Sequence, residues 1–312
     1  MEVFRELESV QKEKNAVITV GTFDGVHLGH VFVINSLLER AHRGGAAATL
    51  VTFDPHPKLV LNPPAAATIS ILTTLDEKLV ILEELGLDRV VVLKFTRDFS
   101  RTSSEEFLKN LLFEKIGFKE IVIGYDHGFG RDRKGSVATA KEIAKKLDFA
   151  VTELPKYKNK LGDVNSSSIR SYLETGDVEK ARLVLGRHYV LNGMVTHGDG
   201  RGKNLNYPTA NITVTRQEKL IPGTGVYAVH VQVGGQRLNG MMNIGVRPTF
   251  NGAAPTLEVH IFDFEEDVYG QEIQIKFVTR LRDEIRFDSS TMLVEQLDHD
   301  KEKCLEIFSH VM

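Results

Sequence analysis

The hydrophobic positions of this 312-residue chain follow two different patterns, which change near residue 186. Up to that point, short apolar runs rich in β-branched residues alternate with longer segments of helical periodicity. The runs predict strands at 16–20, 47–53, 89–95, 120–124 and 149–154. The other segments predict helices at 29–43, 76–85, 103–116, 136–147, 167–174 and 177–185. This alternation predicts an α/β domain whose parallel sheet carries helices on both faces.

The pattern after residue 186 alternates with a period of two, as expected for strands with one buried face. It predicts strands at 189–195, 226–233, 257–264 and 272–278. Turn clusters such as Pro222-Gly223-Thr224-Gly225 separate these strands, and no long helix is predicted between them. We therefore expect a small antiparallel β-barrel, followed by a terminal amphipathic helix from Thr291 to about Phe308. The two patterns predict two domains, residues 1–186 and 187–312.

Composition narrows the class of protein. The chain is 42% hydrophobic and 26% charged, which is typical of a globular protein. Its formal net charge of −3 gives no electrostatic reason to expect a nucleic-acid or membrane partner, and no run of about 18 apolar residues occurs. The one cysteine, Cys304, lies at helical spacing from Leu297 and Phe308, which predicts a core thiol. We expect a cytoplasmic protein that acts on small molecules, with a homo-oligomer left open.

The segment with the most chemical information follows the first predicted strand. It reads Gly21-Thr22-Phe23-Asp24-Gly25-Val26-His27-Leu28-Gly29-His30, and its loop is expected at the carboxyl edge of the sheet. His27 and His30 come from the end of the loop and the first helical turn, so they can converge on one ligand. The glycines permit close approach to the backbone, and the helix N-terminus offers free N–H groups to a phosphate. Two histidines three residues apart also match half of a metal site.

The spacing of these histidines resembles the H-x-G-H signature of the nucleotidyltransferase superfamily. That resemblance implies attack on the α-phosphate of a nucleoside triphosphate, with pyrophosphate as the leaving group.

Three further segments are expected near the same loop. They are Thr52-Phe53-Asp54-Pro55-His56-Pro57, Gly124-Tyr125-Asp126-His127-Gly128-Phe129-Gly130-Arg131 and Asn165-Ser166-Ser167-Ser168-Ile169-Arg170. Taken singly, each also fits a turn, a surface loop or a helix cap. Because they follow successive elements of one predicted sheet, we interpret them together as a site for a planar ring and phosphates.

The four segments together resemble the prokaryotic bifunctional riboflavin kinase and FAD synthetase family, with its motifs G-x-F-D-G-x-H-x-G-H, T-F-x-P-H-P, G-x-D-F-x-F-G and S-S-T-x-I-R. The chain departs from the family at Asp126-His127, where Asp-Phe is frequent, and at Asn165-Ser166-Ser167, where Ser-Ser-Thr is common. The resemblance implies a Rossmann-like nucleotidyltransferase domain that acts as an FMN adenylyltransferase. In it, His27, His30 and Arg170 are implied to be catalytic. Nucleotide contacts are implied for Gly21, Thr22, Phe23, Asp24, Gly29, Asp126, Ser166 and Ser167, and flavin contacts for Phe53, His56 and Phe129.

A Gly-rich basic stretch opens the second half. It runs from Gly198 to Asn211 and departs from the P-loop pattern, because Asn204 stands where Ser or Thr is required. Taken alone, the stretch also fits a flexible hairpin. It resembles the riboflavin kinase motif G-R-x-L-G-x-P-T-A-N, with Asn206 in place of the usual last glycine. The resemblance implies ATP contacts from Gly198, Gly200, Lys203 and Thr209, and Mg²⁺ held by Thr209 and Asn211, whose side-chain oxygens suit that ion.

Later segments match the same family. They are Gly225-Val226-Tyr227, Asn243–Phe250, Leu257-Glu258-Val259-His260, Tyr269-Gly270 and Arg282–Phe287. Alternation puts Glu258 on the strand face opposite Leu257 and Val259, where a solvated residue is the plain interpretation. The resemblance assigns Glu258 as the catalytic base and implies flavin contacts from Arg282 and Glu284.

The function implied by the resemblance is two consecutive flavin reactions. The barrel would convert riboflavin and ATP to FMN and ADP, and the α/β domain would convert FMN and ATP to FAD and pyrophosphate, both with Mg²⁺. A chain with one active half, or a flavin-binding regulatory protein without turnover, are the rival interpretations. The presence of His27, His30, Thr209, Asn211 and Glu258 argues against both rivals, because binding alone needs no base and no group for the departing phosphate.

Overall fold

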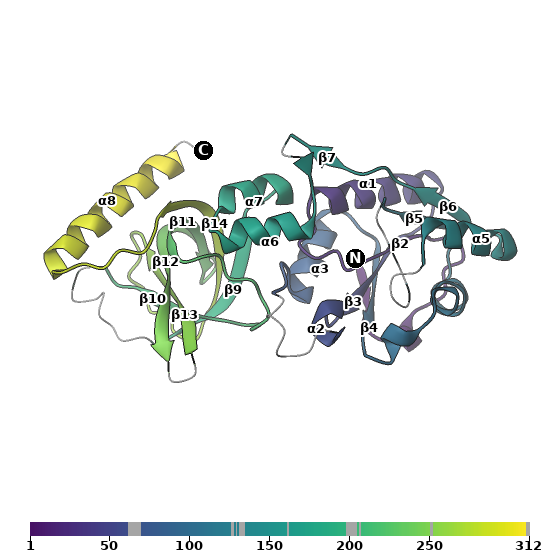
Figure 1. Cartoon of the computed structure of the whole chain (residues 1–312), viewed down its shortest axis with the longest axis horizontal. Coiled ribbons are helices and arrows are strands. Elements are labelled where there is room, and N and C mark those ends of the chain that lie inside the picture. Colours follow the sequence, from purple (N-terminus) through teal and green to yellow (C-terminus); the bar gives the residue numbers. More distant parts are fainter. Residues whose placement is uncertain are drawn as a thin grey trace. The chain divides into compact units, whose positions relative to one another are not determined.

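The computed structural model describes residues 1–61, 70–125, 128, 130, 135–160, 162–197, 205, 207–249 and 252–309. The chain forms two compact units, Met1–Ser166 and Ser167–Met312 (Figure 1). The two short helices predicted at 167–174 and 177–185 therefore group with the barrel rather than with the sheet. The assignment of functional domains to residues 1–186 and 187–312 stays a prediction.

The first unit alternates strands and helices, as the sequence predicts. Its strands are β1 (Glu2–Phe4), β2 (Val17–Val20), β3 (Ala48–Asp54), β4 (Arg89–Lys94), β5 (Glu120–Ile123), β6 (Ala150–Glu153), β7 (Lys158–Asn159) and β8 (Gly162–Asp163). Its helical segments are η1 (Leu7–Ser9), α1 (Leu28–Arg43), α2 (Pro57–Leu61), α3 (Leu75–Glu84), η2 (Phe99–Arg101), α4 (Ser104–Glu106), η3 (Phe107–Ile116) and α5 (Val137–Leu147).

The main sheet has the order β1-β4-β3-β2-β5-β6, and every neighbouring pair is parallel. From β2 the chain moves outward through β3 to β4, then returns to the other side of β2 to form β5 and β6. The sheet therefore has its switch point between β2 and β5, where open α/β sheets bind ligands at the carboxyl ends of the strands. The predicted Rossmann-like parallel sheet is confirmed.

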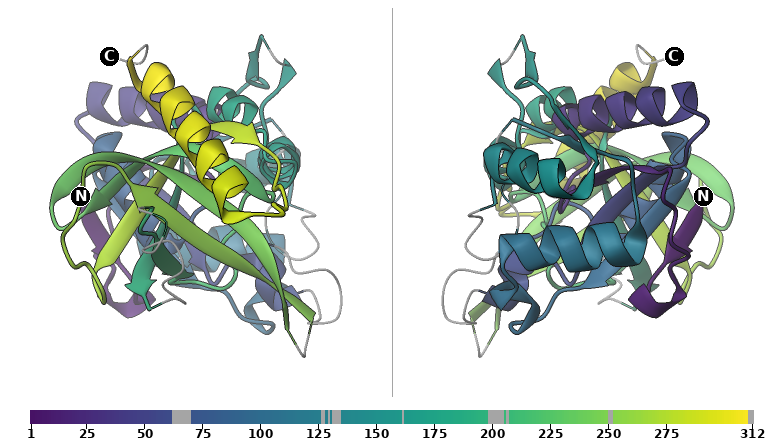
Figure 2. Two further views of the ribbon diagram at one scale, coloured as in Figure 1. Left: turned by 90° about the vertical axis from the view of Figure 1, so that its left-hand side faces the viewer. Right: turned by 90° about the vertical axis from the view of Figure 1, so that its right-hand side faces the viewer.

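Helices cover both faces of this sheet (Figure 2, right). On one face, α1 and α3 pack Ile34, Leu37 and Leu82 against alternate strand residues such as Leu50 and Val90. On the other face, η3 and α5 pack against the strand residues of opposite parity. Strands buried on both sides explain the nearly continuous apolar runs in the sequence.

Two parts of the first unit differ from the prediction. The charged segment 2–15, for which no strand is predicted, contains the edge strand β1, which pairs with β4. The helix predicted at 103–116 forms one α-turn, α4, and then the π-helix η3, in which the N–H of Gly117 donates to the carbonyl of Leu112. Apolar spacing did not distinguish these two helix types, since both bury one face.

The second unit is a closed antiparallel barrel with helices outside it. The barrel order is β10-β13-β12-β11-β14-β9, closed by the pairing of β9 with β10. The strands are β9 (Tyr189–Thr196), β10 (Ala210–Val214), β11 (Gly225–Val233), β12 (Gln236–Thr249), β13 (Gly252–Ile261) and β14 (Glu272–Arg282), and the helices are α6 (Ser166–Glu174), α7 (Val178–Leu185) and α8 (Ser290–Ser309). The predicted barrel and terminal helix are confirmed, although the sequence did not predict β10 or β12 as strands.

The terminal helix α8 lies along the outside of the barrel (Figure 2, left). Cys304 and Phe308 on α8 pack against Ala228, Met241 and other barrel residues. Cys304 is fully buried, and burial raises the pKa of its thiol to about 12, in agreement with the predicted core role. Among the described residues, no helix is both long and apolar enough to cross a membrane.

Candidate active sites

The loop after β2, residues 21–27, ends at the switch point of the sheet. Its neighbours at this edge are the loops after β3 and β5, because those strands flank β2. Three of the predicted site segments, those beginning at Gly21, Thr52 and Gly124, thus lie at or just after the carboxyl ends of three adjacent strands. The fourth is connected to them, since the hydroxyl of Ser166 donates to the backbone carbonyl of Asp24 at 2.9 Å.

The backbone of this loop is unusual and buried. Phe23 (φ 47°) and Val26 (φ 36°) have left-handed backbone conformations that residues with a Cβ rarely adopt. Gly25 lies between them at φ 86°. Phe23 and Val26 are both buried in the core below the loop. Strained conformations of this kind persist only where packing imposes them, and they occur preferentially at functional sites.

His27 caps the N-terminus of α1. Its Nδ1 accepts a hydrogen bond from the backbone N–H of His30 at 3.3 Å, and the two imidazole rings stack with centroids 3.6 Å apart. A Cβ added to Gly29 would lie 3.2 Å from Cε1 and from Nδ1 of His27. The glycine is therefore needed for the close packing of the His27 ring, and the two histidines lie together as the sequence predicts.

Asp24 is buried and bonded within the protein. Its Oδ1 accepts hydrogen bonds from the backbone N–H groups of Leu72 (2.9 Å) and Thr73 (3.1 Å), and the hydroxyl of Thr73 accepts from the N–H of Gly25. These contacts attach the loop to the segment before α3. The nucleotide contact predicted for Asp24 stays a prediction, and so do those of Gly21, Thr22 and Phe23.

Lys78, on α3, was not identified from the sequence. Its side chain is only 4% exposed, and its ammonium donates to the carbonyl of Thr22 at 2.7 Å and to the hydroxyl of Thr52 at 3.2 Å. Burial lowers the pKa of Lys78 to about 8, against the opposing influence of Asp24 and Asp54. One signal was present in the sequence: Lys78 lies on the same stripe of α3 as the buried Leu75 and Leu82.

The predicted flavin residues Phe53 and His56 lie at and just after the end of β3. The Phe53 ring is 5.7 Å from Phe95 and 6.1 Å from Phe99, so an aromatic cluster forms at this edge. The Nδ1 of His56 accepts from the backbone N–H of Lys58 at 3.2 Å.

Four predicted residues of this site lie outside the described residues or in the second unit. Asp126 and Phe129 lie outside the described residues. Ser167 and Arg170 belong to α6 in the second unit, so their role beside His27 stays a prediction.

The second candidate site is a row of side chains on the outer face of the barrel. In β13, Leu257 and Val259 point inward and are buried, whereas Glu258 points outward and is half-buried. Strand register places Asn211 of β10 opposite Glu258 on one side and Asn243 of β12 opposite it on the other. Residues directly opposite in neighbouring strands share a face, so these three side chains lie side by side.

The row extends to the segment before β10. The hydroxyl of Thr209 donates to Oε2 of Glu258 at 3.4 Å, which joins two of the predicted site residues. Nearby, Nδ1 of His260 lies 2.7 Å from the carbonyl oxygen of Pro208, and burial lowers the pKa of this imidazole. Asn243, which belongs to the segment Asn243–Phe250 and has no predicted role, is the third member of the row.

Arg282 and Glu284 border the same face. Register places Arg282 opposite Val226, the residue that also pairs with Asn243. The guanidinium binds the fully buried carboxylate of Asp300 on α8, with Nε to Oδ2 at 2.9 Å and Nη2 to Oδ2 at 2.7 Å. An oxygen of Glu284 lies so close to Gly245 that an added Cβ there would be 2.5 Å away. Their flavin contacts stay predictions, and Gly198, Gly200 and Lys203 lie outside the described residues.

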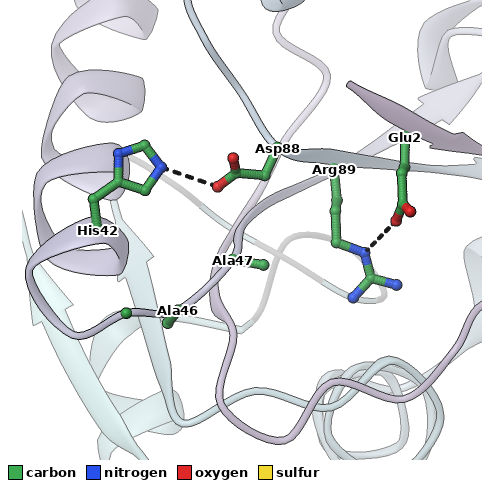
Figure 3. Close-up of a pocket in the computed structure, with 7 residues that line it drawn as sticks. Glu2, His42, Ala46, Ala47, Asp88 and Arg89 are labelled. Atoms are coloured by element: carbon green, nitrogen blue, oxygen red, sulfur yellow. Dashed lines mark hydrogen bonds and ion pairs between the residues drawn. The ribbon is translucent and has the colours of Figure 1, made fainter.

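A cavity of about 500 Å³ lies at the opposite edge of the sheet, by the first residues of β3 and β4 (Figure 3). Its charged groups are already paired, since His42 bonds Asp88 at 3.0 Å and Arg89 contacts Glu2 at 3.4 Å. Because it lies at the starts of these strands, the cavity is away from the switch-point loop, and none of the predicted site residues line it.

The two halves of the chain match two different family models. The model described as FAD synthetase matches residues 9–168, and the model described as riboflavin kinase matches residues 185–308. They occur in the order in which the sheet and the barrel follow each other along the chain.

Relatives cover nearly the whole chain. The bifunctional riboflavin kinase/FMN adenylyltransferase of Bacillus subtilis (strain 168) is 35% identical over 96% of this chain and 95% of its own length. The protein of the same name from Escherichia coli (strain K12) is 32% identical over 99% of this chain and 98% of its own length. A crystal structure described as a macrolide-efflux protein from Streptococcus pneumoniae has a TM-score of 0.88 and 30% identity, covering 96% of this chain and 97% of that one. This chain belongs to the family of bifunctional riboflavin kinase/FMN adenylyltransferases.

Proposed function

We propose that this chain catalyses two consecutive steps of flavin cofactor synthesis. At the barrel, riboflavin and ATP give FMN and ADP. At the switch-point loop, FMN and ATP give FAD and pyrophosphate. The proposal rests on one observation: His27 and His30 lie in the first compact unit, Thr209, Asn211 and Glu258 lie in the second, and each unit matches its own family model.

For adenylyl transfer, a phosphate oxygen of FMN attacks the α-phosphate of ATP, and the bond from the α-phosphate to pyrophosphate breaks. No covalent enzyme intermediate is needed. His27, His30 and Arg170 are proposed to stabilise the negative charge that develops on the transferring and leaving phosphates. The backbone N–H groups of Leu28 and Gly29 in the first turn of α1 are proposed as further donors, because the first turn of a helix supplies no helical acceptor for them.

For phosphorylation, Glu258 is proposed to accept the proton of the riboflavin 5′-hydroxyl as that oxygen attacks the γ-phosphate of ATP. The bond to ADP breaks in the same step. The hydrogen bond from Thr209 to Glu258 supports this role, because it orients the carboxylate without protonating it. Glu258 is also half-buried on the outer face rather than in the barrel interior, so a substrate can reach it.

The donor set beside Glu258 fits Mg²⁺. The Thr209 hydroxyl and the Asn211 amide oxygen are hard oxygen ligands, and strand register sets Asn211 next to Glu258. These two residues are proposed to hold the ion, which when bound neutralises charge on the triphosphate.

We further propose that the chain works on these small molecules in the cytoplasm, without a nucleic-acid or membrane partner. Its net charge of −3 supports this, since neither surface attracts a chain of that charge.

The direct test is chromatography of the products after the purified chain is incubated with riboflavin, ATP and magnesium. The proposal expects FMN to appear first and FAD to follow. Accumulation of FMN without FAD would leave a kinase alone, and recovery of unchanged riboflavin would favour a binding protein. A parallel incubation with FMN in place of riboflavin separates failure of the second step from failure of the first.

A further inference from the structure

Lys78 occupies a position where a lysine is unexpected. It lies on the buried stripe of α3, between Leu75 and Leu82, and is only 4% exposed. Lysine is rarely buried to this extent unless its charge is compensated or used. Its ammonium lies directly beneath the switch-point loop, in contact with Thr22 and Thr52.

The contact with Thr22 fixes the orientation of a peptide group. In a trans peptide the carbonyl and the following N–H point in opposite directions. Because the carbonyl of Thr22 points toward Lys78, the N–H of Phe23 points away from Lys78. Among the residues that the structure describes, no acceptor for this N–H is found. Phe23 has φ 47°, a conformation in which consecutive N–H groups can form a concave anion site.

The ammonium of Lys78 faces two carboxylates and two further oxygens. The groups around it are the carboxylate of Asp24 in the loop, that of Asp54 at the end of β3, and the oxygens of Thr22 and Thr52. On its own helix, Glu77 accepts from the backbone N–H of Thr74. Oδ1 of Asp24 is itself bonded to the N–H groups of Leu72 and Thr73. The buried ammonium therefore offsets the negative charge of Asp24 and Asp54 at the base of the loop, where that charge would repel a phosphate.

We propose that Lys78 is a positioning residue for adenylyl transfer: it holds the Thr22–Phe23 peptide with its N–H toward the phosphates and places a positive charge beneath them. The inference rests on the proposed function of the loop. It concerns a residue that contacts no substrate and acts through the backbone of the loop.

The test variant is Lys78→Met, which keeps the apolar stem and removes the ammonium. Thr22 then keeps one donor, because the hydroxyl of Thr52 also lies 3.2 Å from its carbonyl oxygen. Replacing a buried charge by an apolar group of similar size is often neutral or stabilising. We therefore expect a folded protein whose urea midpoint is equal to or above that of the wild type.

For this variant we expect kcat of FMN adenylylation to fall on the order of tenfold to a hundredfold, with a smaller change in KM for ATP. Riboflavin phosphorylation by the same molecules should stay within about twofold. Lys141→Met, which removes an exposed lysine of the same unit, is the matched control. Unchanged adenylylation in folded Lys78→Met would overturn the proposal. A loss of activity with a lowered urea midpoint would overturn it too, because Lys78 would then serve the fold.

A pH series separates the charge from the hydrogen bonds. The pKa of about 8 predicts that Lys78 loses its proton above about pH 8, although the neutral amine keeps two N–H donors. Wild-type adenylylation should therefore decline above about pH 8, and Lys78→Met should lack this decline. The free energy of unfolding should change in the opposite direction to the activity. Because the folded pKa lies below the ordinary 10.5, wild-type stability should rise between about pH 8 and 10.5. An identical alkaline decline in both proteins would contradict a role for the charge.

These outcomes are distinct from failure of the proposed function. A wild-type chain that makes no FAD from FMN would refute the adenylyltransferase itself. A wild-type chain that makes FAD, together with a Lys78→Met variant that makes it equally fast, refutes only the role of Lys78.

Discussion

The loop site and the barrel site are built in opposite ways. In the loop, Phe23, Asp24 and His27 are themselves buried, and their backbone is held in a strained conformation by what packs below it. On the barrel, Glu258 and Asn211 project from regular strands and are half-buried, with strand register alone setting their spacing. The first site combines backbone groups of a buried loop with two histidine side chains, and the second presents side chains of regular strands.

This difference indicates where each site is vulnerable. A loop that depends on the core beneath it should lose activity when a neighbour such as Gly29 changes, even if the protein stays folded. A row of side chains on a closed barrel should tolerate such changes as long as the barrel holds its register. Four substitutions test the comparison.

The largest effects are expected from one catalytic residue in each site. His27→Ala should lower FMN adenylylation about a thousandfold and leave riboflavin phosphorylation nearly unchanged. Glu258→Ala should lower phosphorylation on a similar scale, about a thousandfold, and leave adenylylation nearly unchanged. Steady-state rates with FMN or riboflavin as the flavin substrate measure both. If either substitution stopped both reactions in a folded protein, the assignment of two sites would fail.

A smaller effect is expected from Asp300→Ala, which breaks the link between α8 and β14. The carboxylate is fully buried and binds Arg282, whose side chain is only 15% exposed. Removing one partner of such a pair leaves a charge without compensation, which costs about 3 kcal/mol.

Urea inactivation curves of the two activities measure the effect of Asp300→Ala unit by unit. The midpoint for riboflavin phosphorylation should fall, while that for FMN adenylylation should hold. Glu302→Ala, at an exposed position of the same helix, is the control. Equal shifts of both midpoints would show that the two units do not respond separately.

The smallest effect is expected from Gly29→Ala. The new Cβ would lie 3.2 Å from the His27 ring and 3.4 Å from the carbonyl oxygen of Val164, so the ring must shift by a few tenths of an ångström. We expect adenylylation to fall about tenfold. Stability should not fall, because alanine is favoured over glycine in a helix by about 1 kcal/mol. Asn35→Ala, on an exposed position of α1, should leave both rates unchanged. Wild-type adenylylation in Gly29→Ala would show that the ring position is not critical.

The sequence predicted the fold where local pattern and tertiary structure agree. The strand predicted at 16–20 is β2, and the helix predicted at 291–308 is α8, because each has one clear apolar face or run. β12 was missed because Gly240, Asn243 and Gly245 interrupt its alternation. Hydrogen bonding to β11 on one side and β13 on the other stabilises that strand, although its own sequence pattern is weak.

The candidate sites were predictable only in part. The motifs indicated His27, His30, Thr209 and Glu258, since these residues share short segments with recognisable spacing. Lys78 was not predicted, because its partner Thr22 lies 56 residues away and only the folded sheet brings the two together. The same holds for the pairing of Arg282 with Asp300, which depends on how α8 packs on the barrel.

The central claim is that one chain carries two separate active sites, and mixing two inactive variants tests it most directly. His27→Ala alone should convert riboflavin to FMN and stop there, and Glu258→Ala alone should leave riboflavin unchanged. An equimolar mixture of the two, supplied with riboflavin, ATP and magnesium, is predicted to accumulate FAD. A mixture of folded variants that forms FMN but no FAD, or no FMN at all, would contradict the account.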